Sequence, residues 1–294
     1  MWTLNPTESR EKKYLNILFD KVKSRAAKYD LNNYLSECLI KKILLVKPCS
    51  VKTLEDELNQ KLKNVPDKNK LLTEIFNYKT LIVNNKKASF AIAKLIGVNT
   101  CVYCNRQYIF TVTKGKKGIV RPEFDHYLPK SIYPFLALSL YNLIPSCHIC
   151  NSNCKGREEL PENFNPYLNK DTFFKFSYIP DGQGIPKKIK IKDINPKYKT
   201  EIKKFLAVFK LKEIYDYHIP LEVNEIYTFA TKYSDAYLQQ LLNQLGKNFN
   251  LSQEEAYRML FGTELLESKD NDRPLSKLKR DILIELGVIS PNKP

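Results

Sequence analysis

Two Cys-x-x-Cys pairs constrain the fold of this chain more than any other feature. The four cysteines are Cys101, Cys104, Cys147 and Cys150. Each pair lets two thiolates chelate one ion, and two pairs form the closed tetrahedral sulfur site that is typical of structural zinc. The alternative is four core cysteines that bind no metal. A shared zinc ion would fold the chain back and bring Asn151 close to Asp125 and His126.

The remaining cysteines bear on compartment and on alternative ligands. Cys38 and Cys49 are predicted to be buried as small hydrophobic side chains. If Cys147 or Cys150 failed to bind metal, His148 or Cys154 would be the replacement. His148 is otherwise expected to face solvent. The chain lacks an apolar leader and a membrane-length apolar run, so we expect a cytoplasmic protein without a membrane partner, whose reduced thiols favour zinc over disulfides.

Charge is concentrated around these pairs. The 294 residues carry a net charge of +16, and residues 98–157 contain 8 basic and only 2 acidic side chains. A positive field suits a polyanionic partner, and nucleic acid is the default choice. The alternative is a surface that is basic throughout and has no specific partner.

The segments on either side predict an α+β protein. Residues 1–97 show helical periodicity in five stretches, the second running from Leu31 to Ile43 and the last ending at Gly97, and they carry no evident chemistry. In residues 158–294 a hairpin is expected around the PDGQG turn. It is followed by helices over about 197–217 and 221–245, the latter ending at Gly246, and by two further helices.

The central segment, residues 98–157, changes period. RQYIFTVT and IVRPEFDHYL flank the turn KGKKG, which predicts a hairpin whose second strand carries Asp125 and His126. YNLIP is expected to be extended, and a short helix should run from Asn151 to about Gly156. Neighbouring side chains on a regular strand point to opposite faces. Asp125 and His126 can therefore share a site only if the strand twists or bulges, or if a backbone carbonyl helps to hold the ion.

The motifs DHYLPKS, YNLIPSCHIC and CNSNCKG together resemble the zinc-containing HNH endonucleases of the ββα-metal class. The resemblance covers residues 98–157. It implies a zinc-stapled ββα-metal nuclease module between the helical region and the hairpin-plus-helices region. The chain is similar, more loosely, to the HNH nucleases that antiphage systems such as Septu encode beside an ATPase. That likeness implies an ATPase partner and a role in defence.

Residue types in this module suit phosphodiester cleavage. A neutral imidazole is a suitable base, which assigns His126, and the oxygens of Asp125 and Asn151 suit Mg²⁺ or Mn²⁺. The resemblance implies the same roles, although Asn151 stands where the family name has a histidine. Asn153 is an alternative ligand. The resemblance assigns Asn142 to fixing the loop and orienting the imidazole, whereas the plainer reading is that it caps a turn.

The predicted function is metal-dependent hydrolysis of nucleic acid, expected to be DNA. The basic side chains expected to contact it are Lys130, Lys155, Arg106 and Arg121. Two alternatives remain open at this point. One is a zinc module that binds nucleic acid without cutting it, and the other is a subunit whose zinc region braces a protein interface.

Overall fold

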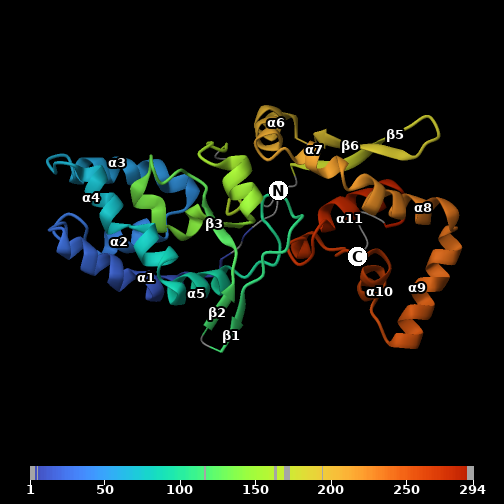
Figure 1. Ribbon diagram of the computed structural model, residues 1–294, viewed down its shortest axis with the longest axis horizontal. Coiled ribbons are helices and arrows are strands. Elements are labelled where there is room, and N and C mark those ends of the chain that lie inside the picture. Colours follow the sequence, from blue (N-terminus) through green and yellow to red (C-terminus); the bar gives the residue numbers. More distant parts are fainter. Residues whose placement is uncertain are drawn as a thin grey trace. The chain divides into compact units, whose positions relative to one another are not determined.

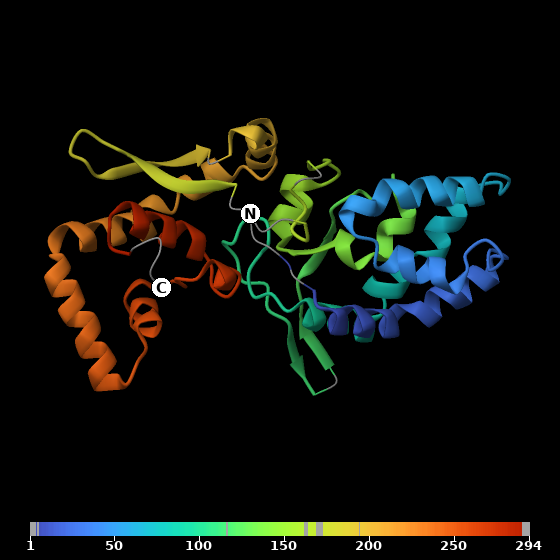
Figure 2. The ribbon, with the colours of Figure 1, turned by 180° about the vertical axis from the view of Figure 1, so that it is seen from behind.

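The computed structural model describes residues 4, 6–115, 117–161, 164–168, 173–193 and 195–289. It divides the chain into two compact units (Figures 1 and 2). The first contains residues 99–108 with 171–294, and the second contains residues 3–98 with 109–170. Units follow spatial contacts rather than chain order, so the predicted division at residues 97 and 157 stays a prediction.

Helices make up the amino-terminal part of the second unit. They are α1 (Glu8–Lys28), α2 (Glu37–Leu44), α3 (Val51–Lys61), α4 (Lys68–Ile75), the π-helix η2 (Lys79–Val83) and α5 (Lys86–Ile96). Five helical stretches were expected here, but the second begins later than predicted. Ser36 caps α2 by accepting a hydrogen bond from the backbone N–H of Leu39. Leu31 and Leu35 are buried in the preceding loop. Their four-residue spacing continues that of α2, which is why the sequence placed them in the helix.

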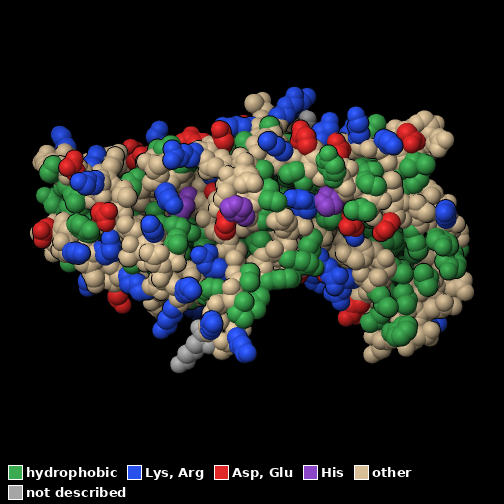
Figure 3. Space-filling view, in the orientation of Figure 1, with side chains coloured by type: hydrophobic (Ala, Val, Ile, Leu, Met, Phe, Trp, Pro, Cys, Tyr) green, Lys and Arg blue, Asp and Glu red, His purple; other side chains and the backbone are tan. Residues whose placement is uncertain are grey.

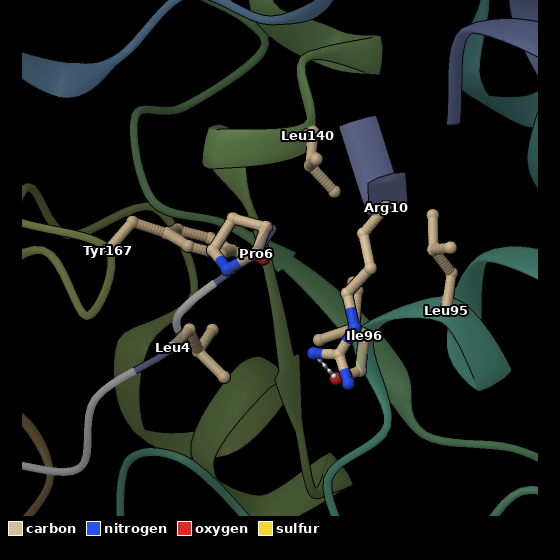
Figure 4. Close-up of a pocket in the computed structure, with 7 residues that line it drawn as sticks. All are labelled: Leu4, Pro6, Arg10, Leu95, Ile96, Leu140 and Tyr167. Carbon is tan, nitrogen blue, oxygen red and sulfur yellow. Dashed lines mark hydrogen bonds between the residues drawn. The ribbon is translucent and has the colours of Figure 1, made fainter. Parts of the chain in front are cut away.

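The start of α1 packs against the end of α5. Arg10 donates a hydrogen bond of 3.4 Å from Nη1 to the backbone oxygen of Ile96, where a cation also suits the negative end of the α5 dipole (Figure 4). The void around these side chains measures only about 10 Å³ and is mostly apolar. It is a packing gap about the size of one water molecule rather than a ligand site.

Two short antiparallel strand pairs follow in the same unit. Strands β1 (Val112–Lys114) and β2 (Lys117–Val120) form a hairpin, and β3 (Glu123–His126) pairs with β4 (Leu143–Ser146). The hairpin around KGKKG is confirmed, but its second strand ends at Val120, so the prediction that this strand carries Asp125 and His126 is wrong. Pro122 has no N–H to donate, and the β2 strand ends before it. Asp125 and His126 lie on the separate strand β3, labelled in Figure 1, which pairs with β4 in the second part of the YNLIP segment.

The first unit joins residues 99–108 to a hairpin and six helices. Its elements are β5 (Phe174–Pro180), β6 (Pro186–Asp193), α6 (Lys199–Val208), α7 (Leu211–Asp216), α8 (Asn224–Lys232), α9 (Asp235–Phe249), α10 (Gln253–Phe261) and α11 (Ser276–Glu285). The hairpin around PDGQG is confirmed. The hairpin packs on α11, where buried Asp281 accepts hydrogen bonds of 2.9 Å from the Phe176 backbone and from Lys277.

The helix boundaries in this unit differ from those predicted at three places. The stretch 221–245 is not one helix, because α8 ends at Lys232 and Ser234 caps the start of α9. The stretch 197–217 is broken at Lys210, which adopts a left-handed backbone conformation with φ of 48°. Gly246 lies inside α9, and the helix ends instead at Asn250 with φ of 51°. Asparagine is one of the few residues besides glycine that tolerates this conformation, so the C-cap was misplaced by four residues. No helix in the described ranges is long and apolar enough to cross a bilayer.

Gly97 gives a direct test of the capping prediction. It caps α5 with φ of 67°, and a Cβ there would lie 3.3 Å from the Lys94 oxygen. Gly97→Ala should lower the free energy of unfolding by about 1–2 kcal/mol, because an L side chain is strained in this region. Chemical denaturation monitored by circular dichroism measures the loss. Gly182→Ala is the control, since a Cβ there meets no atom within 4 Å.

Candidate metal centre and active site

The cysteines of the two Cys-x-x-Cys pairs converge. The ligand atoms of Cys101, Cys104, Cys147 and Cys150 all lie within 4.8 Å of one another, and all four residues are buried. Zn–S bonds of about 2.3 Å in a tetrahedron place the sulfur atoms about 3.8 Å apart, so the separation is compatible with one ion. The donor set therefore fits structural zinc.

Backbone amides support the negative charge of the sulfur atoms. The N–H of Arg106 donates to Cys104 Sγ and the N–H of Cys150 donates to Cys147 Sγ, both at 3.5 Å. Such amides stabilise thiolates rather than thiols. Between the first pair and Arg106, Asn105 takes a left-handed conformation with φ of 47° that turns the chain back.

The first Cys-x-x-Cys pair is held by residues far along the chain. The hydroxyl of Tyr215 donates to the Cys104 backbone oxygen, and the N–H of Leu275 donates to the Asn105 oxygen at 2.6 Å. The buried amide of Asn105 donates to the hydroxyl of Thr100 at 2.9 Å and to the backbone oxygen of Asp270 at 2.6 Å. These contacts fix the loop independently of metal ligation.

The other cysteines and His148 lie outside the cluster. Cys38 and Cys49 are exposed, so the prediction that they are buried is wrong. Helix α2 buries Leu39, Ile40 and Ile43, which leaves Cys38 on the solvent side. Cys154 is half-buried and the His148 side chain is 68% exposed, and neither belongs to the four-sulfur group. No replacement ligand is needed.

Zinc content tests the sulfur cluster. Cys101→Ser should abolish stoichiometric zinc and lower stability by several kcal/mol, because the binding free energy of a structural zinc ion contributes directly to folding. Inductively coupled plasma mass spectrometry and thermal denaturation provide the two measurements. Cys38→Ser, at an exposed position, should keep one zinc per chain. Full zinc content in Cys101→Ser would rule out this site.

An open cavity of about 540 Å³ lies beside strand β3 in the second unit. It brings together five of the predicted functional residues with an additional acidic, an aromatic and a basic side chain. The residues that carry its chemistry are Asp125, His126, Asn151, Lys130, Arg121, Glu123, Tyr78 and Arg157. Its lining, as far as the structure describes the chain, does not include Asn142, Lys155 or Arg106.

The imidazole of His126 is held as a neutral base. Nε2 lies 3.0 Å from the backbone oxygen of Ala137. A carbonyl oxygen only accepts hydrogen bonds, so Nε2 must carry the hydrogen and the lone pair of the neutral ring is on Nδ1. Burial, with the positive charge of Lys130 adding to it, lowers the pKa of His126 to about 3. The ring edge of Tyr78 packs against the imidazole, with centroids 4.5 Å apart.

Asn142 fixes the loop that supplies this carbonyl group. Its Oδ1 accepts from the N–H of Leu128 at 2.8 Å, and its Nδ2 donates to the oxygens of Leu128 and Leu136 at 3.0 and 3.1 Å. Leu136 immediately precedes Ala137, the residue that binds His126. Asn142 thus lies behind the imidazole, where it orders the loop rather than capping a simple turn.

Asp125 and Lys155 form a buried pair under the cavity. Lys155 Nζ lies 3.2 Å from Asp125 Oδ1 and 2.9 Å from the backbone oxygen of His126, and both charged side chains are at most 4% exposed. The π-helix η5 (Ile149–Lys155) carries this lysine inward. Lys155 was predicted to contact phosphate. Its ammonium group instead binds the protein, so that assignment is corrected: burial leaves it to hold the end of β3.

The strand itself is regular, because its pairing with β4 shows no register shift from Glu123 to His126. Asp125 and His126 nevertheless border one cavity, since His126 is the last residue of the strand. The expected twist or bulge is not required.

A carboxylate orients the side chain of Asn151. Glu123 Oε2 accepts from Asn151 Nδ2 at 2.8 Å, and its Oε1 lies 2.8 Å from Nδ1 of the exposed His148. A carboxylate accepts hydrogen bonds and does not donate them when ionised, so it fixes which end of the amide faces it. The amide oxygen of Asn151 is left as the atom that a cation would contact. Asn153, the alternative ligand, is exposed and does not line the cavity.

Basic side chains border the cavity on several sides. Lys130 is exposed by surface area, yet partial desolvation lowers its pKa despite the opposing charge of Asp125. Arg121 and Arg157 also line the cavity. Arg106 belongs to the other compact unit, so the structure does not group it with them. Lys and Arg side chains are scattered over the visible face in Figure 3 rather than gathered in one patch.

Three chemistry-bearing residues of this cavity, Tyr78, Glu123 and Arg157, were not predicted from the sequence. Tyr78 comes from the segment before η2, in a region that was assigned no chemistry, and burial raises its pKa to about 12. Glu123 lies two residues before Asp125 on β3. Because side chains two apart on a strand point to the same face, this spacing could have placed Glu123 beside Asp125. Nothing in the local sequence around Tyr78 distinguishes it from a core residue.

Comparisons with known proteins give one short match. The chain is 37% identical to Protein ea31 of Escherichia phage lambda over 59 residues. That match covers 19% of this chain and 20% of the phage protein, so the chain spans only about a fifth of its relative. No protein-family model matches the chain, and no solved structure matches it.

Asn142→Asp tests the support behind the imidazole. The substitution keeps the size of the side chain but puts an acceptor against the oxygens of Leu128 and Leu136. Leaving these buried groups unpaired should cost about 2–4 kcal/mol of unfolding free energy. Urea denaturation measures the change, and Asn153→Asp at an exposed position should change stability by less than about 0.5 kcal/mol. Equal stability of both variants would contradict the role assigned to Asn142.

Proposed function

We propose that the cavity beside β3 is the active site of a metal-dependent endonuclease that hydrolyses DNA phosphodiesters. The observation that carries the proposal is the orientation of His126. The Ala137 carbonyl occupies Nε2 and leaves the Nδ1 lone pair available, in the same cavity as a carboxylate and a fixed amide oxygen. An uncharged nitrogen in this position can take a proton from water.

The proposed roles follow from the donor types. Asp125 and Asn151 would hold Mg²⁺ or Mn²⁺, since both offer hard oxygen ligands and water can complete the shell. When bound, that ion would stabilise charge on the phosphate and on the leaving oxygen. His126 deprotonates the attacking water, while Lys130, Arg121 and Arg157 attract the phosphate backbone.

The depressed pKa of His126 belongs to the protein without substrate. Its cause is burial together with the positive charges of Lys130 and Lys155. A phosphodiester bound at Lys130 would bring a negative charge close to the ring and oppose the effect of both lysines. Substrate binding would thereby strengthen the base at the point where it is used.

The resemblance to zinc-containing HNH endonucleases agrees with these roles. The fit of four buried sulfur atoms to zinc and the order of two strands followed by a short helix support the same proposal. The looser likeness to antiphage nucleases adds a role in defence and an ATPase partner to the proposal.

His126→Ala tests the proposed base. The variant should cleave plasmid DNA about 10²–10⁴-fold more slowly in Mg²⁺, because proton transfer by a positioned side chain contributes that factor. Zinc content should stay at one ion per chain, because His126 is not a sulfur ligand. Cleavage is followed on agarose gels with Mg²⁺, Mn²⁺ or EDTA, and EDTA should stop it.

The proposed metal ligand Asn151 is tested by Asn151→Ala, with Asn153→Ala on the same short helix as the control. The first should lose cleavage and the second should keep it. Wild-type rates in His126→Ala would rule out the proposal. DNA binding without any metal-dependent cleavage by the wild type would indicate a non-catalytic module.

A further inference from the structure

A second cavity adjoins the proposed active site. It has a volume of about 420 Å³ and shares three lining residues, Tyr78, Lys130 and Ser131, with the first. Its own lining is mostly apolar and includes Phe76 and Pro134. Small-molecule binding sites in proteins have volumes of about 300–1,000 Å³, so this cavity is large enough for a ligand.

The wall that the two cavities share contains Tyr78, Lys130 and Ser131, with the Lys130 cation over the Tyr78 ring. Lys130 Nζ lies 4.7 Å from the centroid of the Tyr78 ring. The edge contact between Tyr78 and His126 fixes the same ring on the other side. Cation–π and edge-to-face contacts of this kind hold an aromatic ring in one orientation. The wall is therefore a preformed surface directly beside the proposed base.

The charges around the second cavity have one sign. Lys79 and Lys130 line it, and no Asp or Glu is among the described residues that do so. The polar cavity, in contrast, contains Glu123 and Asp125. An apolar pocket bordered only by cations suits a ligand with a flat apolar body and an attached anion. A nucleotide has this composition, with a stacking base joined through sugar to phosphate.

We propose that the second cavity binds an unpaired nucleobase next to the scissile phosphodiester, so that the preferred substrate is single-stranded or locally unpaired DNA. This inference rests on the proposed function of the first cavity. A base inside a duplex is stacked and paired, and entering a pocket costs a few kcal/mol that an already unpaired base does not pay. The cavity would therefore select DNA by strand state rather than by sequence.

The first experiment compares substrates of the same sequence that differ in strand state or in one base. Four oligonucleotides are used: a paired duplex, a duplex with one unpaired nucleotide, a single strand, and the single strand with an abasic site at that nucleotide. Single-turnover cleavage by wild type in Mg²⁺ should be at least about tenfold faster on the unpaired substrates than on the duplex. The abasic site should weaken binding by about tenfold, as expected for one lost stacking contact.

Binding is measured separately from cleavage. Fluorescence anisotropy with His126→Ala in Ca²⁺ reports the effect of the abasic site without turnover. This arm distinguishes the two proposals. Absence of cleavage on every substrate would overturn the nuclease, whereas the same affinity for base-bearing and abasic strands would overturn the base pocket alone.

A cavity-filling variant tests the location. Thr73 lines the second cavity from the exposed face of α4 and touches neither the shared wall nor the proposed ligands in any recorded contact. Thr73→Trp should reduce the preference for unpaired DNA to about twofold or less. Thr53→Trp, at an exposed position on α3, is the matched control. Equal substrate preference in wild type and Thr73→Trp would overturn the assignment of the second cavity to a nucleobase. That result is also the one expected if the cavity holds a side chain of a partner protein instead.

Discussion

Four buried sulfur atoms impose the strongest constraint on this chain. Thiolates so close together repel one another, and a shared divalent cation turns that repulsion into a net attraction. Strand β4 runs directly into Cys147, and the backbone N–H of Asn151 donates to the Cys147 oxygen at 3.0 Å. The position of Cys147 thus determines where Asn151 lies beside the cavity.

A chain of hydrogen bonds determines the chemistry in turn. Asn142 donates to the Leu136 carbonyl group, and the carbonyl group of the next residue, Ala137, binds His126. Lys155 binds Asp125 and the backbone oxygen at the end of β3. None of these supporting side chains lines the cavity or needs to touch a substrate. Their burial means that the imidazole and the carboxylate are ordered before any ligand arrives, which is what a preorganised site requires.

Spacing in the sequence predicted those features that depend on local geometry. The paired cysteines, the strand over Leu143–Ser146 and the cap at Gly97 follow from chelation, from alternation and from the conformational freedom of glycine. The first two residues of YNLIP instead lie in a 3-10 helix. Features set by distant contacts were not predictable. Cys38 is exposed because α2 turns its apolar face elsewhere, and Tyr78 reaches the cavity only through the packing of the amino-terminal helices.

Secondary-structure boundaries failed for a similar reason. The expected hairpin was interrupted by Pro122, a residue whose effect depends on whether its strand needs a donor at that point. Asn250 replaced Gly246 as the end of a helix because either residue can adopt the left-handed conformation. In both cases the sequence contains two acceptable signals, and tertiary packing selects one.

The loop that carries the first pair of cysteines leans on the carboxy-terminal half of the chain, through Tyr215, Leu275 and the backbone of Asp270. Residues 98–157 contain every sulfur ligand, yet they lack the groups that shape this loop. The motif-bearing stretch is consequently not a portable cassette. If it were excised or grafted onto another scaffold, it would keep its four sulfur ligands but lose the distant residues that hold the first Cys-x-x-Cys loop in shape.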